Sequence, residues 1–369
     1  MKFRTLQQQR RRVWTLDNGC VTLGMLAGGG HICTLLHKDV PGLNPLWTPH
    51  WPQIEPWQYT KKNAAQFGNS RLLAGIAGHN PCLAGFGEPS TEEKQADLDC
   101  HYEAPVARWH LLSQQVGPQT AGFTTLTVLP VAQMCLARTI STRRGSALLH
   151  VKETLANLAR HDMPFTMCQH VSFGAPFLEK GVTLFDMPAT KGHTFPDAFG
   201  RVQRLQRDTA FTWPNGPGVK GPVDLRMIAK QQRVSSDFTT QLMDPRQEYA
   251  WFSAVHPARG LLLAYVWRRA DYPWIGNWEE NFCRLQLPWA GKELVRGMEF
   301  ANTPFPTSVR NAVDRGTFHG ERTYRWLPAR GTLTFEYWIV LQPVTPDCRG
   351  VRTITMNGGA PILQLKTEN

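Results

Sequence analysis

The strongest constraint on the fold is a series of short segments in which apolar and polar residues alternate. Four such segments follow Trp109, and each ends in a turn: residues 122–130, 133–142, 147–156 and 164–173. Successive side chains of a strand point to opposite faces, so this alternation predicts strands with one buried face. Their spacing of about 10–15 residues is typical of an antiparallel β sandwich. We find no amphipathic helix longer than two turns and no alternation of strands with helices.

The rest of the chain continues this pattern. Residues 13–37 have the character of a hairpin around the turn Asp17-Asn18-Gly19. Further strands are predicted at residues 249–255, 261–268, 292–300, 331–341 and 351–355. The 31 glycines and 27 prolines are scattered, which suits short strands joined by turns better than long helices. We therefore predict an all-β fold of antiparallel strands.

Three segments fall outside the regular pattern. Residues 1–12 end in three consecutive arginines and are expected to form a flexible basic arm. Residues 186–222 are rich in Pro and Gly and are expected to form a long loop excursion, which is unusual unless it serves as a lid or an interface. Residues 271–281, with the sequence DYPWIGNWEEN, are expected to form an aromatic and acidic loop.

The charge and the cysteines limit the partners and the location. The formal net charge of +11 attracts anions at long range, but the basic residues are dispersed, which argues against a nucleic-acid partner. The eight cysteines form no Cys-x-x-Cys pair and no zinc-like spacing, so we expect reduced thiols and no metal. No run of about 18 apolar residues exists, and no signal peptide is recognised, so we expect a cytoplasmic protein without membrane contact.

His170 is the first candidate for chemistry. It lies in PFTMCQHVSFGAPFL, residues 164–178, near the end of a predicted strand and before a turn at Gly174. A histidine held there by rigid backbone can donate or accept a proton near neutral pH. The alternative is a half-buried histidine that only makes a hydrogen bond.

A second group of polar residues lies between residues 78 and 104. His79, His101 and Glu103 could line a site within these predicted loops. His101 and Glu103 would share a face of an extended segment, which makes a metal pair conceivable. Two ligands without a clear third give little support for a metal site.

Taken in order along the chain, several motifs resemble those of the aldose 1-epimerase (galactose mutarotase-like) superfamily. They are Gly28-Gly29-Gly30-His31-Ile32, Asn44-Pro45-Leu46-Trp47, His101-Tyr102-Glu103-Ala104, Asn157 followed by residues 170–178, and Arg296-Gly297-Met298-Glu299. Together they span about residues 20–345. The resemblance implies a galactose mutarotase-like β supersandwich, formed by residues 1–369 as a single large domain of antiparallel strands.

The resemblance also implies a reaction that needs no cofactor. In that superfamily a carboxylate takes the proton of the anomeric hydroxyl of a sugar, while a histidine donates a proton to the ring oxygen. Carried over by position, His170 is the acid and Glu299 the base. The substrate-binding residues that we expect are His101, Glu103, Arg71, His79 and Trp278, with Trp274 as a second possible stacking residue and Asp186 as the nearest match to the sugar-binding aspartate.

Two departures keep other functions open. Tyr102 stands where the superfamily has a small residue, which narrows the space beside His101 and favours a non-catalytic carbohydrate-binding or sensor protein. Glu103 adds a carboxylate that could orient His101 instead of touching substrate.

A third alternative is a metal-assisted lyase or isomerase that uses His79, His101, Glu103 and His170. The net charge and arginines such as Arg71 and Arg296 also raise the possibility that the small-molecule sugar is anionic.

Overall fold

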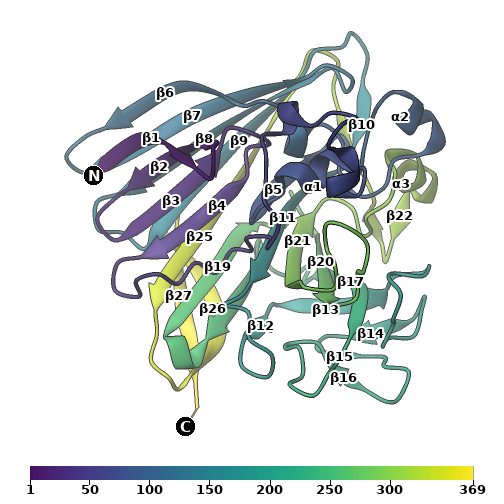
Figure 1. The fold of residues 1–369 in the computed structure, drawn as a ribbon. Helices are drawn as coiled ribbons and strands as arrows, with labels where there is room; N and C mark the ends of the chain where they lie inside the picture. Colours follow the sequence, from purple (N-terminus) through teal and green to yellow (C-terminus); the bar gives the residue numbers. More distant parts are fainter. Residues whose placement is uncertain (369) are drawn as a thin grey trace.

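Two large antiparallel sheets make up most of the computed structural model, which describes residues 1–368 (Figure 1). The first has thirteen strands, in the order β1 (Lys2–Gln8), β2 (Arg11–Asp17), β3 (Val21–Leu26), β4 (Ile32–His37), β5 (His79–Leu83), β11 (Met167–Gly174), β21 (Leu294–Ala301), β20 (Trp274–Asn281), β17 (Ser235–Met243), β13 (Ala189–Thr194), β14 (Ala210–Thr212), β15 (Asn215–Gly216) and β16 (Val223–Asp224). The all-β prediction is confirmed.

The second large sheet has eight strands. Their order is β12 (Leu184–Asp186), β18 (Tyr249–His256), β19 (Leu261–Arg268), β25 (Thr332–Pro343), β9 (Leu148–Asn157), β8 (Met134–Arg143), β7 (Thr120–Leu129) and β6 (His110–Val116). Three two-stranded sheets pair β10 (Met163–Phe165) with β24 (Arg325–Leu327), β22 (Thr317–Phe318) with β23 (Glu321–Arg322), and β26 (Cys348–Asn357) with β27 (Ala360–Thr367).

Helices are few and short. The α-helices of the described residues are α1 (Arg71–Gly75), α2 (Thr91–Gln95) and α3 (Val309–Arg315), and the 3-10 helices are η1 (Pro56–Gln58), η2 (Ala64–Phe67), η3 (Ala104–Val106) and η4 (Pro257–Arg259). None of these helices combines the length and the apolar character that a membrane crossing requires.

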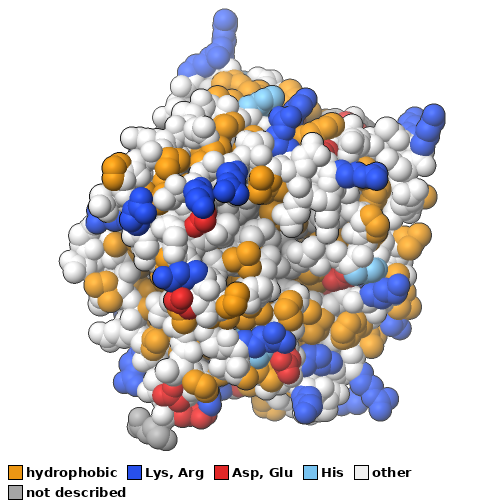
Figure 2. Space-filling model, turned by 60° about the vertical axis from the view of Figure 1, so that its left-hand side comes forward, with side chains coloured by type: hydrophobic (Ala, Val, Ile, Leu, Met, Phe, Trp, Pro, Cys, Tyr) orange, Lys and Arg blue, Asp and Glu red, His pale blue; other side chains and the backbone are white. Residues whose placement is uncertain are grey.

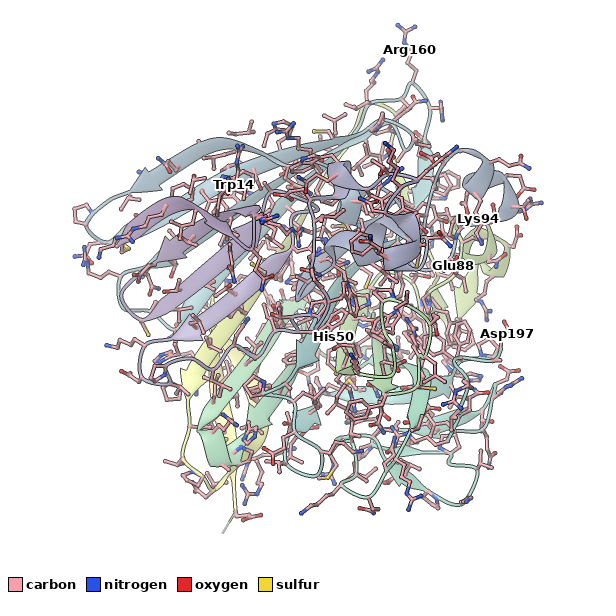
Figure 3. All side chains as sticks on the ribbon, in the orientation of Figure 1. Trp14, His50, Glu88, Lys94, Arg160 and Asp197 are labelled. Carbon is pink, nitrogen blue, oxygen red and sulfur yellow. The ribbon has the colours of Figure 1, made fainter. Side chains whose placement is uncertain are left out.

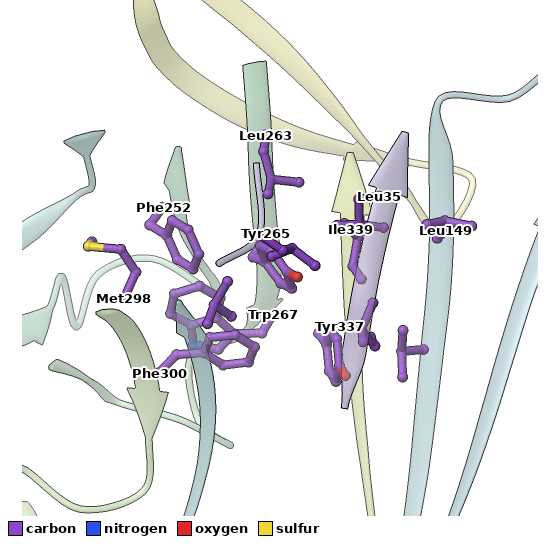
Figure 4. Close-up of a cluster of buried hydrophobic side chains, with 14 of the residues drawn as sticks. Leu35, Leu149, Phe252, Leu263, Tyr265, Trp267, Met298, Phe300, Tyr337 and Ile339 are labelled. Atoms are coloured by element: carbon purple, nitrogen blue, oxygen red, sulfur yellow. The ribbon is translucent and has the colours of Figure 1, made fainter. Parts of the chain in front are cut away.

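The two large sheets pack face to face over one apolar core. Figure 4 shows part of it, where side chains of β18, β19 and β25 meet Met298 and Phe300 of β21. The rings of Trp267 and Phe300 stack with their centroids 4.4 Å apart. Because strand side chains alternate, the next residues on β21, Gly297, Glu299 and Ala301, point to the other face of the thirteen-stranded sheet.

The sequence analysis found strands of both kinds, those with one exposed face and some that are buried on both faces, such as β18 and β19. The predicted strands at residues 122–130, 133–142 and 147–156 correspond to β7, β8 and β9, whose residues alternate between buried and partly exposed. The prediction of a loop at residues 271–281 was wrong, because residues 274–281 form the central strand β20. All eight residues of β20 are buried, and its carboxylates have internal partners, such as Ser235 Oγ, which donates to Glu279 at 2.8 Å.

The prediction of a flexible arm at residues 1–12 was wrong. β1 pairs with β2 along its whole length, and Arg11 is only 2% exposed. The Arg11 guanidinium lies 3.6 Å from the Glu55 carboxylate and donates to the Gly28 carbonyl. Only Arg11 of the run is buried, and Glu55 compensates its charge, while Arg10 and Arg12 stay exposed.

Two other expectations also need correction. Residues 186–222 are not one loop excursion, since they contain β13, β14 and β15 at the edge of the thirteen-stranded sheet. The strand predicted at residues 351–355 does not complete a large sheet, because β26 pairs only with β27.

A buried polar network ties the two sheets together. Arg138 on β8 and Glu153 on β9 are completely buried, with a guanidinium nitrogen 2.6 Å from the carboxylate. Arg138 also donates to the Gly30 carbonyl, and Gln169 of β11 donates to the other oxygen of Glu153 at 2.6 Å. The charges of Arg138 and Glu153 therefore compensate each other inside the core. The hydrogen bond from Gln169 to Glu153 connects β11 to the eight-stranded sheet.

We expect Glu153→Ala to destabilise the protein strongly. Removing one partner leaves the Arg138 charge buried without compensation, which costs about 3–5 kcal/mol. Lys152→Ala, the neighbouring change on the same strand, removes only a 3.8 Å pair with Glu336 at the surface and should cost under about 1 kcal/mol. Denaturant unfolding followed by tryptophan fluorescence measures both; equal losses would contradict the role of the network.

Candidate active site

His170 and Glu299 face each other on neighbouring strands. β11 lies between β5 and β21, and in its register His170 pairs with Asn80 on one side and with Glu299 on the other. The side chains of such a pair stand on the same face, and here His170 Nε2 lies 3.1 Å from Glu299 Oε1. Both residues are buried. The sheet thus brings the predicted acid and base into contact.

These two side chains open onto a cavity of about 430 Å³ on the face of the sheet away from the core. His101 and Trp278 also line it, as the sequence predicts for substrate-binding residues. An apolar wall is formed by Leu72, Leu73, Ile76, Phe199, Phe238 and Trp289. Polar groups are supplied by Asn69, Ser70, Asp99, Arg284 and Gln286. The volume is that of a small-molecule site.

Glycine at position 297 leaves room for the Glu299 carboxylate. A Cβ atom there would stand 2.3 Å from Glu299 Oε1, which is closer than atoms can approach. That oxygen has only His170 Nε2 beside it, at 3.1 Å, and Trp278 Nε1 is buried without any hydrogen-bond partner. A buried donor without a partner is unfavourable, so Trp278 Nε1 points to a ligand that accepts its hydrogen.

An unusual backbone directs His101 into the cavity. His101 and Tyr102 have φ of 63° and 65°, in the left-handed region that non-glycine residues rarely adopt. The His101 amide donates to the Gly87 carbonyl, and the Gly87 amide donates to His101 Nδ1 at 3.0 Å. Because Nδ1 accepts a hydrogen bond, the hydrogen of the neutral ring lies on Nε2. The ring centroids of His101 and His170 are 5.2 Å apart.

Tyr102 leaves the cavity free. Its ring turns away and fills the space above Gly85, while its hydroxyl donates to Glu93 and accepts from the Val309 amide. The expected narrowing beside His101 is therefore not found.

Burial controls the protonation of the His170–Glu299 pair. It raises the pKa of Glu299 to about 8, because the ionised carboxylate would lose its hydration. Burial and the nearby His101 ring lower the pKa of His170 well below its usual value. Near neutral pH, the free pair therefore carries one transferable proton, which lies on Glu299. Ser172 Oγ lies 3.1 Å from His170 Nδ1, and a hydroxyl can donate to the neutral ring or accept from the charged one.

Two of the expected substrate-binding residues lie elsewhere. His79 pairs with Val171, so it points to the core face, where its ring contacts Gln169 and the Tyr265 hydroxyl. Glu103 accepts from the amides of residues 131 and 132 and so anchors the turn between β7 and β8; it does not orient His101.

Arg71, a third expected residue, is placed beside the site without lining the cavity. Its side chain pairs with Asp97 at 3.6 Å and lies over the ring of Tyr59. Only its backbone amide reaches the cavity wall, where it donates to Asp99.

The remaining candidates from the sequence are also distant. Asp186 belongs to the eight-stranded sheet and pairs with Lys366. Trp274 packs against Phe318, and Arg296 points to the core side, where it lies over the ring of Phe185.

The residues required for a metal-assisted reaction do not come together. His79 and Glu103 are separated from His101 and His170 by their orientation, and no group of three or more His, Cys, Asp or Glu side chains within residues 1–368 is arranged to hold a metal ion.

Arg284 and Trp289 are the main site residues that the sequence analysis missed. Both lie in the irregular segment after β20, where no periodicity or motif marks them. The Arg284 guanidinium carbon lies 5.2 Å from the Trp278 ring centroid and 4.8 Å from that of Trp289.

Glu88, another residue that lines the cavity, pairs with Lys94 of α2 at 3.4 Å (Figure 3).

Comparisons with known proteins show the fold. No family model and no curated protein matches the sequence. Among solved structures, a provisionally assigned aldose 1-epimerase of Klebsiella pneumoniae has a TM-score of 0.67 at 13% identity, covering 93% of this chain and 83% of that one. A galactose mutarotase-like protein of Clostridium acetobutylicum has a TM-score of 0.60 at 11% identity, covering 93% and 99%.

A galactose mutarotase related enzyme of Lactobacillus acidophilus has a TM-score of 0.56 at 12% identity, covering 90% of this chain and 98% of that one. The predicted galactose mutarotase-like fold is therefore confirmed. At such identities the likeness shows the fold alone, and activity has to be argued from the site.

We expect Glu299→Gln to change the pH dependence of stability. The carboxyl of Glu299 ionises near pH 4.5 in the unfolded chain and near pH 8 in the folded protein, so between these values the folded state holds an extra proton and stability falls as pH rises. The variant lacks this carboxyl group. Its free energy of unfolding should therefore rise relative to that of the parent by up to about 1.4 kcal/mol per pH unit as the pH increases.

Denaturant unfolding of parent and variant at about pH 5, 6.5 and 8 measures this effect. His170 has a lowered pKa, so its contribution makes stability rise with pH below about pH 6.5. This contribution is the same in parent and variant if the pKa of His170 is the same in both, and it then cancels in their difference. Glu336→Gln on the eight-stranded sheet is the control. A difference that is constant with pH would contradict the buried, protonated state of Glu299.

Proposed function

We propose that this protein is an aldose 1-epimerase-like enzyme that interconverts the anomers of a sugar in the cavity. The observation that carries the proposal is the buried contact of His170 with Glu299 at the cavity floor, 3.1 Å apart. A histidine and a carboxylate in contact provide an acid and a base for one small polar substrate. The unpartnered Trp278 Nε1 supplies a donor for one of its hydroxyl groups.

The reaction assigned to this pair opens and closes the sugar ring. Glu299 takes the proton of the anomeric hydroxyl as the bond between C1 and the ring oxygen breaks. The bonding electrons pass to the ring oxygen, which takes a proton from His170, and C1 becomes an aldehyde carbon. Rotation about the bond between C1 and C2 presents the other face of the aldehyde, and the reverse steps close the ring. Atoms and electrons balance without a cofactor.

The proton count of the free pair fits this reaction. One proton is present near neutral pH, and its transfer from Glu299 to His170 creates the required base and acid. Hydroxyl groups of a bound sugar would stabilise the carboxylate that burial disfavours. Ser172 accepts the hydrogen of Nδ1 once His170 is charged, and His101 has its Nε2 hydrogen for a sugar oxygen.

A non-catalytic carbohydrate-binding or sensor protein on the same fold is the alternative. Tyr102 was its sequence argument, and Tyr102 points away from the cavity. Catalysis is therefore the better supported of the two.

The eight cysteines are all unpaired, which fits the reducing cytoplasm as the location.

We expect His170→Asn and Glu299→Gln each to slow anomer exchange by at least about a hundredfold, the usual contribution of a positioned acid or base. NMR exchange spectroscopy on a panel of aldoses measures the rates. Arg71→Ala is the matched control; because its side chain does not line the cavity, exchange should remain within about twofold of the parent.

Three outcomes have distinct meanings. Loss of exchange in both site variants supports the assigned pair. Sugar-dependent line broadening without exchange by the parent would replace catalysis with binding or sensing. A strong loss in Arg71→Ala would restore the sequence-based assignment of Arg71 as a sugar-binding residue.

We further propose that the sugar carries an anionic group that Arg284 contacts. Arg284 is the only Lys or Arg among the described residues that line the cavity. One of its nitrogens pairs with Glu280 at 3.3 Å, and the guanidinium lies against the rings of Trp278 and Trp289. Elsewhere the positive charge is spread out, as on the face in Figure 2, where Lys and Arg side chains are dispersed.

Arg284→Gln should discriminate between charged and neutral sugars. A lost charge-assisted hydrogen bond costs about 1.5–3 kcal/mol, so kcat/KM for a phosphorylated or carboxylated aldose should fall about tenfold or more. The value for the neutral parent sugar should change much less. Equal losses for both sugars would refute the anionic substrate and leave the anomer exchange itself untouched.

A further inference from the structure

Cys82 and Cys168 form a thiol pair beneath the cavity. They are direct partners in the register of β5 and β11, and both are completely buried. Their thiol groups are close enough for each to shift the pKa of the other. The proposed reaction uses neither of them, although Cys168 is two residues before His170 and therefore shares its face of the strand.

The spacing of such a pair suits a disulfide. Directly opposed residues of antiparallel strands have Cα atoms about 4.5–5.5 Å apart, and disulfides form between Cα atoms about 4.4–6.8 Å apart. The register of Cys82 and Cys168 therefore meets the Cα spacing that a disulfide requires. The other unpaired cysteines on strands, such as Cys135 and Cys348, have no cysteine opposite them.

The Asn80 side-chain amide donates to the Cys82 sulfur at 3.6 Å. Burial alone would raise the pKa of Cys82, but the nearby Cys168 and His101 side chains lower it to about 6. The thiolate is the nucleophilic form of cysteine, so Cys82 is the sulfur prepared to react.

The cavity gives a small reagent access to this region. Cys100 and His101 line the cavity, whereas Cys82 and Cys168 do not. A peroxide is much smaller than the sugar for which the cavity has room. To reach the buried Cys82 from the cavity, it has to pass the neighbouring His101 side chain.

We propose that Cys82 and Cys168 are a peroxide-reactive dithiol site that closes to a reversible disulfide. The Cys82 thiolate attacks one oxygen of hydrogen peroxide, the O–O bond breaks, and Cys82 becomes a sulfenic acid while hydroxide leaves and takes up a proton to form water. The Cys168 thiol then attacks the Cys82 sulfur and releases a second water. Two thiols are oxidised and one peroxide is reduced to two waters.

The disulfide also changes the candidate active site. It removes the Cys82 sulfur as a partner of His101 and pulls on β11 two residues from His170. This consequence for anomer exchange rests on the proposed function, whereas formation of the disulfide does not. Oxidation is expected to reduce exchange at least tenfold, with recovery after dithiothreitol.

The test is peptide mapping of the full chain after hydrogen peroxide treatment. The native protein is oxidised, its remaining thiols are alkylated under denaturing conditions, and the digest is analysed by mass spectrometry. We expect a linked peptide pair containing Cys82 and Cys168, with the loss of two hydrogen atoms, which dithiothreitol abolishes. Cys283→Ser, a change at another buried cysteine outside the site, should leave this link intact.

Two further variants keep the result interpretable. Cys168→Ala should carry sulfenic or more oxidised Cys82 instead of the link, and Cys168→Ser repeats the test if the first variant does not fold. A link between Cys82 and Cys100, or unmodified Cys82 in the folded parent while other cysteines oxidise, would overturn the proposal. The mass readout does not depend on sugar turnover, so failure of the proposed enzyme function leaves this result readable.

Discussion

The pairing of β11 with β5 and β21 is the constraint on which the rest of the site depends. It puts His170 opposite Glu299, and it directs Gln169, one residue earlier, into the core. A shift of one residue would exchange the two faces and bring the amide to the cavity and the imidazole to the core. The link from Gln169 to Glu153, itself paired with Arg138, opposes such a shift. Core packing and chemistry are therefore properties of the same strand.

Water exclusion then determines how the site behaves. The carboxyl of Glu299 is kept protonated by burial, and the imidazole of His170 is kept neutral by the same cause. Neither state would be expected for these residues at a surface. The walls that exclude water, above all the two tryptophans and Phe238, are thus part of the acid-base chemistry as much as the two residues that exchange protons.

The sequence was informative where a short apolar or alternating segment is bounded by a clear turn. β7, β8 and β9 alternate, β18 and β19 flank a turn, and all five were predicted, whereas the equally buried β5 and β20 contain polar residues that made them look like loops. The motif order led to His170 and Glu299. The choice of His79 from the polar segment was wrong, because only the register shows that Asn80, and not His79, stands beside His170. Arg284 lies in an irregular segment, and its position depends on tertiary contacts that no local pattern records.

The floor of the cavity is formed by central strands, and much of its wall is formed by connecting segments. Strands β11, β20 and β21 are held on both sides by neighbouring strands, while Arg284, Trp289 and Phe199 come from connecting segments. Segments of that kind accept substitutions and insertions at much lower cost than a central strand does. Substrate preference in this architecture can therefore diverge during evolution by exchange of wall segments, while the floor that performs proton transfer stays the same.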